Sequence, residues 1–354
     1  MSTSLPIHGR GASSNPPNRF IPLYRESIPG WTEEEDPAPR TRFFKDTSRT
    51  VIATNDSPDV GFTHSLNPYR GCEHGCVYCF ARPFHEHLGL SAGLDFESQI
   101  FVKEDAPELL RKELMSPKWV PQMVAIGGVT DPYQPIERRY KVMRRILEVL
   151  DKTNHPVGIV TKSALVLRDL DILARMADRG LVKVALSVTT LDPELARKME
   201  PRAATPMRRL ETLRRLSQAG VPTTIMTAPI IPAINDMDIE RILEAGKMAG
   251  VKEAGYVLLR LPLEVKDLFH EWVREHFPER ADKVINIVRE TQGGKDYDSK
   301  WFTRGRGTGP YAWLIGRRFQ MACERLGLNE RRLSLDVSQF RRPEQSDGQL
   351  KLFA

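Results

Sequence analysis

Residues 67–80, which read NPYRGCEHGCVYCF, hold three of the four cysteines of this 354-residue chain at the spacing C-x3-C-x2-C. They are Cys72, Cys76 and Cys79, whereas Cys323 lies far along the chain. So few cysteines do not form a disulfide framework, and three thiolates on one short loop can surround a small inorganic centre. The stretch therefore predicts a metal centre.

The identity of that centre stays open on the cysteines alone. Ferredoxin-type clusters use four cysteines at other spacings, so three local ligands indicate a [4Fe–4S] cluster with one iron free to bind a substrate. Zinc is an alternative, with His74, His85 or His87 as the fourth ligand, although the chain has no second C-x2-C pair. Chance clustering of structural cysteines is the third interpretation. Gly71 and Gly75 permit the backbone turns that direct the sulfurs inward.

From about residue 61 onward, short apolar runs alternate with segments of helical periodicity. Such runs are typical of parallel strands that are covered on both faces. Six of them predict a parallel α/β sheet, open or curled into a partial barrel. The runs are Phe62–Leu66, Met123–Ile126, Val157–Val160, Val182–Leu186, Thr223–Met226 and Tyr256–Leu259.

Polar or glycine-rich segments follow these strands one after another. Beyond the cysteine loop they are residues 127–133, 161–163, 187–190 and 228–236. Because the carboxyl ends of parallel strands gather at one rim, where such folds place their sites, we expect these segments to form a single site.

The cysteine motif also contains an aromatic residue, Tyr78, and C-x3-C-aromatic-x-C resembles the signature of the radical SAM superfamily. Residues 129–137 (VTDPYQPIE), 161–163 and 229–236 resemble the branch of spore photoproduct lyase, and within it a bacterial group mostly without assigned function. Residues 294–298 and 305–310 resemble the same group. The resemblance implies a partial (β/α)6 TIM-like barrel with an N-terminal leader and a C-terminal helical extension. The expected parts are an extended or partly disordered leader over 1–60, the barrel over 61–262, the extension over 263–335 and a flexible tail over 336–354.

The resemblance further implies two cofactors, a [4Fe–4S] cluster and S-adenosylmethionine. Cys72, Cys76 and Cys79 would bind three irons, and the methionine amine and carboxylate would chelate the fourth. Val129 stands where the family usually has an acidic residue, so Asp131 is taken as its replacement. The other expected cofactor-binding residues are Tyr78, Gly127, Gly128, Lys162 and Ser187.

The implied function is reductive cleavage of S-adenosylmethionine to a 5′-deoxyadenosyl radical, which abstracts hydrogen from a substrate. An electron donor such as flavodoxin or ferredoxin is implied, and nucleic acid is a candidate substrate. Cys323 falls in a helical pattern, and no cysteine matches the hydrogen-donor cysteine of spore photoproduct lyase, so its repair activity is not transferred. For Glu200 or Arg202, a cofactor role and a place in a solvated turn are equally favoured interpretations.

The alternative function is a non-catalytic iron–sulfur or zinc protein that binds nucleic acid through the basic segment 295–318. That segment interleaves Trp301, Phe302, Tyr311 and Trp313 with cations, so bases could stack on the rings. A loop that closes the barrel with its rings packed inward is the favoured interpretation. The net charge of +6 adds little.

The sequence gives no sign of a membrane partner. It contains neither an apolar run long enough to span a bilayer nor the apolar core of a secretory signal. The expected location is therefore cytoplasmic, and the oligomeric state is left open.

Overall fold

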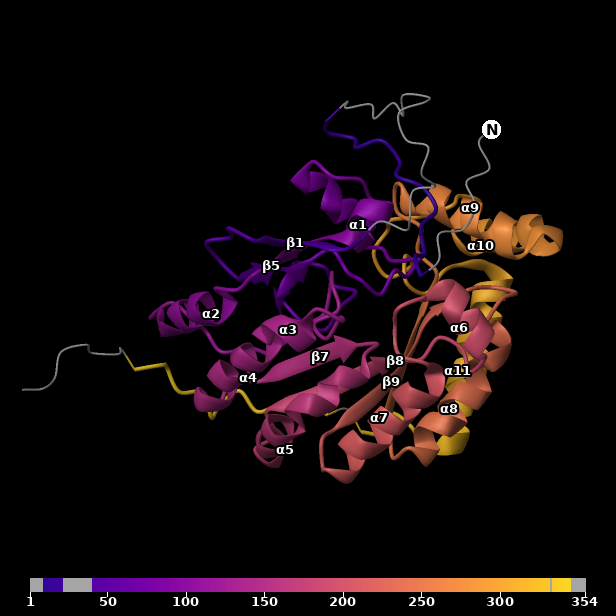
Figure 1. Cartoon of the computed structure of the whole chain (residues 1–354). Helices are drawn as coiled ribbons and strands as arrows, with labels where there is room; N and C mark the ends of the chain where they lie inside the picture. Colours follow the sequence, from indigo (N-terminus) through magenta and orange to yellow (C-terminus); the bar gives the residue numbers. More distant parts are fainter. Residues whose placement is uncertain (1–8, 22–39, 332, 345–354) are drawn as a thin grey trace, which may run out of the picture.

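The computed structural model describes residues 9–21, 40–331 and 333–344. Its main sheet has the order β10-β9-β8-β7-β6-β3-β2, in which all neighbours are parallel except the β2–β3 pair. All six predicted strands are confirmed, and together with β2 they form an open, curled sheet (Figure 1). The strands are β2 (Ile52–Thr54), β3 (His64–Leu66), β6 (Val124–Ile126), β7 (Val157–Thr161), β8 (Val182–Ser187), β9 (Thr223–Ile230) and β10 (Glu253–Leu258).

The two faces of this sheet differ in burial. Side chains that face outward, such as Ile159 and Leu186, are fully buried under helices, whereas Val160 in the central strand β7 is 41% exposed. The inward positions include small residues such as Ala185 and Gly255, which are only partly buried. The prediction that the strands are covered on both faces is therefore wrong, because helices cover only the outer face.

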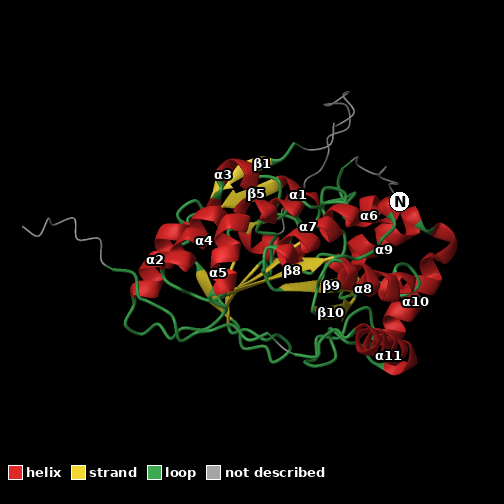
Figure 2. Cartoon of the chain, turned by 90° about the horizontal axis from the view of Figure 1, so that it is seen from below, coloured by secondary structure: helices red, strands yellow, loops and turns green. Residues whose placement is uncertain are grey.

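The helices gather along one side of the strands, while loops run along the other (Figure 2). In the longer helices the apolar positions recur every three to four residues, which gives each of these helices a single buried stripe. They are α1 (Leu94–Ser98), α2 (Ala106–Met115), α3 (Glu137–Tyr140), α4 (Val142–Lys152), α5 (Leu170–Asp178), α6 (Pro193–Met199), α7 (Pro206–Gln218), α8 (Ile239–Met248), α9 (Val265–His276), α10 (Ala281–Thr291) and α11 (Gly309–Leu326). Four short 3-10 helices are η1 (Arg82–Leu88), η2 (Ala164–Asp169), η3 (Asp236–Asp238) and η4 (Pro278–Arg280).

A long crossover between β3 and β6 carries the cysteine stretch. It includes β4 (Tyr69–Arg70) and β5 (Gln99–Val102), which pair with β1 (Arg42–Lys45) in a three-stranded sheet of order β1-β5-β4. Thus two strands, β1 and β2, lie within the predicted leader, where the sequence analysis placed none. Residues 1–8 and 22–39 of that leader, and residues 345–354 of the predicted tail, lie outside the described residues.

Residues 9–21, which we call the N-terminal strap, cross the cysteine loop and the segment after it. The Gly11 and Ala12 amides donate to the two carboxylate oxygens of Glu97 over 3.0 and 2.9 Å. A Cβ at Gly11 would lie 1.7 Å from the Gly75 carbonyl oxygen, so only glycine fits this approach. The strap therefore packs directly on the loop that holds the cysteines.

The C-terminal extension contains α9, α10 and α11, and the loop before α11 reaches the opposite edge of the sheet. The Arg304 guanidinium pairs with Asp59 and donates to Ser57, both in the β2–β3 loop, and the Leu258 amide of β10 donates to the Gly305 carbonyl. We call this the Asp59–Arg304 latch. It joins the β2–β3 loop to the end of β10, and β2 and β10 are the two edge strands of the open sheet.

Three of the four aromatic residues that the sequence predicts to pack inward over 295–318 do not do so. Trp301, Phe302 and Trp313 are 52%, 70% and 70% exposed, and of the four only Tyr311 packs against the core. The loop does close the sheet, but it does so through the latch, which leaves its rings free to face solvent. Cys323 is buried in α11, as its helical pattern predicts.

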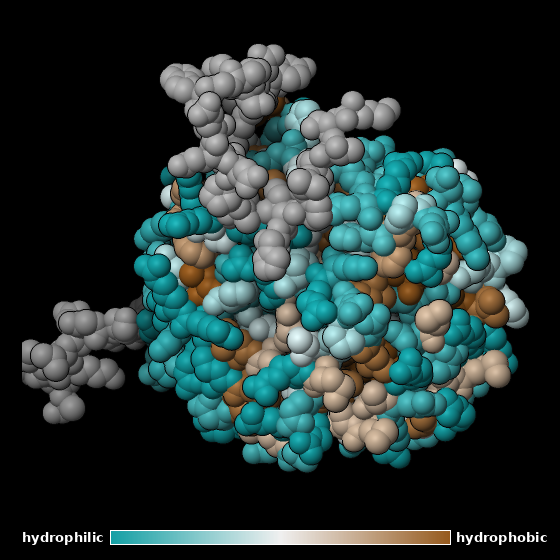
Figure 3. Space-filling model, turned by 45° about the vertical axis from the view of Figure 1, so that its right-hand side comes forward, coloured by the Kyte–Doolittle hydropathy of each residue, from teal (hydrophilic) through white to brown (hydrophobic). Residues whose placement is uncertain are grey.

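The face brought forward in Figure 3 is mostly hydrophilic, with small apolar patches scattered across it. Each helix in the described part of the chain is too short or too polar to cross a membrane.

A buried histidine gives the fold a pH dependence. His155 lies between Trp119 and Phe340, with ring centroids 5.6 and 5.4 Å away, and burial lowers its pKa from the usual 6.5 to about 4. The unfolded chain therefore binds a proton here that the folded chain does not, and stability falls as the pH decreases from 6.5 towards 4. Between pH 7 and pH 4.5 the free energy of unfolding of wild type should fall by about 2 kcal/mol because of His155. We expect His155→Phe to lack this part of the fall.

Urea unfolding at the two pH values measures this effect. His87→Phe, which alters an exposed histidine, is the control and should retain the wild-type pH dependence. An equal pH dependence in wild type and His155→Phe would contradict the assignment.

Candidate cofactor site

The cysteine loop is held in a tight conformation at the carboxyl end of the sheet. Gly71 and Gly75 adopt positive φ angles of 79° and 68°, which confirms the predicted turns. The Cys72 amide donates to the Phe96 carbonyl over 2.9 Å. Cys72 and Cys76 are buried, while Cys79 is partly exposed, and all three are free thiols. The loop thus presents three unbridged sulfurs.

The three thiols lie within electrostatic reach of one another. Burial, followed by the charges of Asp131, Cys76 and Cys79, raises the pKa of Cys72 well above its usual value. Burial likewise raises the pKa of Cys76 to about 12, against an opposing effect of Lys162. Buried thiols of this kind become thiolates only beside a strong positive charge, such as bound metal.

This donor set fits an iron–sulfur cluster better than a single ion. No group of three or more cysteine, histidine or carboxylate side chains in the described ranges is spaced to ligate one metal ion. A cubane distributes its cysteines over different irons, so its sulfurs stand further apart than those around zinc. His74, one of the predicted zinc ligands, instead faces the Asp131 carboxylate, with Nδ1 3.3 Å from Oδ2.

Tyr78 and Arg209 meet at a buried carboxylate, Glu200. The Tyr78 hydroxyl and the Thr189 hydroxyl donate to Glu200 Oε1, and the Arg209 guanidinium pairs with Oε2. Burial raises the pKa of Glu200, but Arg209, Lys162 and Tyr78 outweigh it, so the net shift is downward. This network, which we call the Glu200 cluster, ties the cysteine loop to α6 and α7. Sequence reasoning missed Arg209, since an arginine on a helix normally faces solvent.

Lys162, at the end of β7, places its ammonium 5.8 Å from the centroid of the Tyr78 ring. Burial lowers the pKa of Lys162, whereas Cys76 and Glu200 raise it by more, so the group stays protonated. No hydrogen bond or ion pair engages this ammonium within the part of the chain that the structure describes. It is a positioned cation with donors to spare, beside the thiols.

Asp131 is fully engaged by protein groups. Its Oδ1 accepts from the Thr161 hydroxyl and the Tyr133 amide, over 2.7 and 2.9 Å, and its Oδ2 accepts from the Lys162 amide over 2.7 Å. Burial acts to raise the pKa of Asp131, but His74 and these donors hold it at about 2. The carboxylate therefore joins the cysteine loop to the end of β7.

The glycine turn after β6 has two distinct members. Gly127 has a φ of 100°, and a Cβ there would lie 2.1 Å from the Val160 carbonyl oxygen. A Cβ at Gly128 would meet nothing within 4 Å, so its backbone borders open space. Ser187, at the end of β8, donates its hydroxyl to the Ala228 carbonyl over 2.7 Å. Its oxygen retains acceptor capacity.

Glu73 and Arg202 reinforce the cysteine loop from outside. Arg202 Nη2 donates to Glu73 Oε1 over 2.9 Å, and the Arg202 amide donates to the His74 carbonyl over 3.2 Å. The Glu73 amide donates to Gln134 Oε1 over 2.8 Å. Arg202 therefore holds the cysteine loop through Glu73 and His74. Glu200, not Arg202, is the residue that contacts Tyr78.

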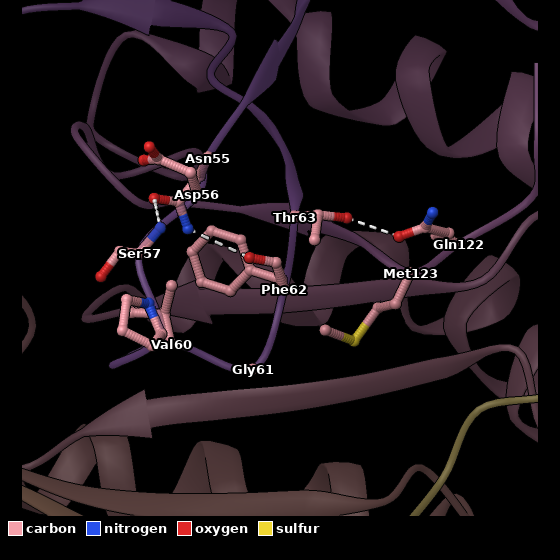
Figure 4. A pocket seen from close by; sticks show the side chains of 10 residues that line it. Asn55, Asp56, Ser57, Val60, Gly61, Phe62, Thr63, Gln122 and Met123 are labelled. Atoms are coloured by element: carbon pink, nitrogen blue, oxygen red, sulfur yellow. Dashed lines mark hydrogen bonds between the residues drawn. The ribbon is translucent and has the colours of Figure 1, made fainter.

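A separate pocket of about 400 Å³ lies at the amino ends of β3 and β6 (Figure 4). It is lined by the β2–β3 loop and by Gln122 and Met123. The Thr63 hydroxyl donates to Gln122 Oε1, and Asn55 Nδ2 donates to the Phe62 carbonyl over 3.1 Å. None of the predicted site residues lines this pocket.

Comparison with known proteins gives concordant matches. A family model described as the radical SAM superfamily matches residues 66–246. An uncharacterised protein of Mycobacterium tuberculosis is 36% identical over 242 residues, which cover 67% of this chain and 71% of that protein. An uncharacterised protein of Methanocaldococcus jannaschii is 28% identical over 232 residues, 66% of this chain and 83% of that protein.

Solved structures share the fold. A spore photoproduct lyase mutant superimposes with a TM-score of 0.59 and 17% identity, covering 81% of this chain and 80% of its own. Another mutant, with bound AdoMet and dinucleoside spore photoproduct, gives a TM-score of 0.58 and 16% identity over the same shares. At such low identity the likeness supports the architecture, a partial barrel of parallel strands.

Proposed function

Because the chain belongs to the radical SAM superfamily, whose members use a [4Fe–4S] cluster and S-adenosylmethionine, we propose that Cys72, Cys76 and Cys79 are its three cluster ligands. The observation that carries this proposal is the set of three free thiols on one tight loop at the carboxyl end of the sheet. When bound, the cluster would supply one electron that cleaves S-adenosylmethionine to a 5′-deoxyadenosyl radical, which abstracts hydrogen from the substrate.

The surrounding residues would orient S-adenosylmethionine. The Lys162 ammonium is placed to bind a carboxylate, because it is charged and has donors to spare. The open backbone at Gly128 allows close approach of the methionine amine, and the Ser187 hydroxyl oxygen can accept from the ribose. Asp131 acts through its neighbours, since its oxygens are already engaged by Lys162 and Thr161.

The curled sheet would shield the reaction from solvent. The strap covers the cysteine loop on one side, and the latch closes the open edge of the sheet on another. Exclusion of water limits side reactions of a reactive intermediate.

Anaerobic reconstitution tests the proposed function. The loaded protein should contain about four irons, and it should release 5′-deoxyadenosine from S-adenosylmethionine when dithionite is added. A fully loaded cluster that yields no 5′-deoxyadenosine would contradict the proposal. Zinc retained through purification would favour the non-catalytic alternative.

Lys162→Ala and Ser187→Ala test the placement of S-adenosylmethionine. We expect Lys162→Ala to weaken its binding to the loaded protein by about tenfold or more, because a charged hydrogen bond to the carboxylate is lost. Ser187→Ala should have a smaller effect of about threefold. Isothermal titration calorimetry without reductant measures both. Lys183→Ala, at the other end of β8, is the matched control and should bind normally; unchanged affinity in both test variants would contradict the placement.

Nucleic acid is a candidate substrate on one specific observation. Trp301, Phe302 and Trp313 are exposed near Lys300 and Arg317, an arrangement in which bases can stack and cations can meet phosphates. Deuterium transfer into 5′-deoxyadenosine from labelled DNA, RNA and peptide pools would identify the substrate class. Flavodoxin and ferredoxin are the candidate physiological reductants.

A further inference from the structure

Arg260 has an unusual environment two residues beyond the end of β10. Its guanidinium carbon lies 5.0 Å from the centroid of the Phe80 ring and 5.8 Å from that of Tyr297. Nη2 donates to the Tyr297 hydroxyl over 3.2 Å. Two rings from different segments therefore fix the plane of this guanidinium.

The charge of Arg260 has no carboxylate partner among the described residues. Its Nε is buried and makes no hydrogen bond to any part of the chain that the structure describes. The deeply buried arginines behave differently, since Arg82 pairs with Glu97 and Arg209 with Glu200. A guanidinium carries five N–H donors, and a buried donor left unpaired costs free energy. A bound ligand or an ordered water is what ordinarily supplies the missing acceptor in such an arrangement.

The position of Arg260 relates it to the cysteine site. Phe80 directly follows Cys79 and is 39% exposed, so the guanidinium borders the cysteine loop. Tyr297 belongs to the segment that leads to the latch. The pKa of Asp59 in the latch is lowered chiefly by the Phe302 amide, then by Arg304 and Arg260, against the effect of burial. Arg260 therefore stands between the cysteine loop and the latch.

We propose that Arg260 is a substrate-binding residue that recognises an anionic oxygen group, a phosphate or a carboxylate, on the molecule from which hydrogen is abstracted. The proposal rests on the proposed function, because it takes the cysteine loop as the reactive centre. The planar guanidinium can bind such a group through two parallel N–H donors. The flanking rings hold that plane in advance, which reduces the entropy lost on binding.

Fluorescence anisotropy of the cluster-loaded protein with S-adenosylmethionine and no reductant tests the proposal. One probe is fluorescein-labelled oligothymidylate, which presents phosphates, and the other is a fluorescein-labelled oligoglutamate peptide, which presents carboxylates. We expect one of them to bind, and Arg260→Gln to weaken that binding by about tenfold or more. Arg260→Lys, which keeps the charge but loses the fork, should give an intermediate loss.

Arg215→Gln is the control. Arg215 is exposed on α7, outside segment 295–318, and pairs with no carboxylate in the described chain. Its variant should bind the probe within about twofold of wild type. Equal losses in Arg260→Gln and Arg215→Gln, or no binding of either probe by wild type, would overturn the proposal.

The same samples separate this inference from the proposed function. Formation of 5′-deoxyadenosine with dithionite and without probe should be unchanged in Arg260→Gln. If wild type forms 5′-deoxyadenosine but the probe results fail, only the role of Arg260 is wrong. If loaded wild type forms none, the proposed function itself fails.

Discussion

Replacing Cys76 with alanine is expected to abolish stable cluster binding and to lower 5′-deoxyadenosine formation by more than about a hundredfold. Only two thiols would remain on the loop, and a cubane held by two protein ligands is readily lost. The loop itself should persist, because the Cys72 amide and the positive φ of Gly75 do not depend on the Cys76 sulfur. The measurements are iron content, the visible absorption of the cluster and product yield after reconstitution.

Cys323→Ala is the matched control for this substitution. Cys323 is also a buried free thiol, but it lies in α11, where it packs with Ile315 and Phe319. Its variant should load normal iron and form normal amounts of product. If Cys76→Ala retains a full cluster, or if Cys323→Ala loses it, the ligand assignment is wrong.

The second large effect concerns stability and arises in the Glu200 cluster. Arg209→Leu removes the cation that compensates the buried Glu200 carboxylate, and we expect it to lower the free energy of unfolding by about 3–5 kcal/mol. The Tyr78 hydroxyl cannot replace that charge. Tyr78 belongs to the cysteine loop and donates to Glu200. The loss of Arg209 should therefore also loosen that loop. Urea unfolding under anaerobic conditions measures the change.

Two further variants separate a buried ion pair from loss of packing. The double variant Glu200→Leu with Arg209→Leu removes both charges, so it should recover much of the lost stability. Glu211→Ala breaks the exposed pair with Arg214, whose nitrogen and oxygen are 2.7 Å apart, and should cost less than about 1 kcal/mol. A double variant that is less stable than Arg209→Leu would contradict this account.

The sheet was largely predictable because its strands are short apolar runs bounded by polar or glycine-rich turns. Val157 and Val182 begin such runs, and each begins a strand. β1 and β2 were missed because their residues are mostly exposed and give no apolar pattern. The open inner face was also missed, because an apolar run does not show which face of a strand is left uncovered by helices. The exposure of Val160 identifies that face.

The site was predictable where its residues are close in sequence. The spacing of the cysteines needs no tertiary information, and Lys162 was singled out because it follows a strand. Arg209 was missed because it meets Glu200 through the packing of two helices, which no local pattern records. The engagement of Asp131 by Thr161 was missed for the same reason, since the two belong to different strand ends.

The strap can seat on the cysteine loop only through Gly11, because the Gly75 carbonyl leaves no room even for a Cβ at that position. Any larger residue there would separate the strap from the loop. Coverage of the cysteine loop by residues 9–21 therefore depends on the absence of a single carbon atom at position 11.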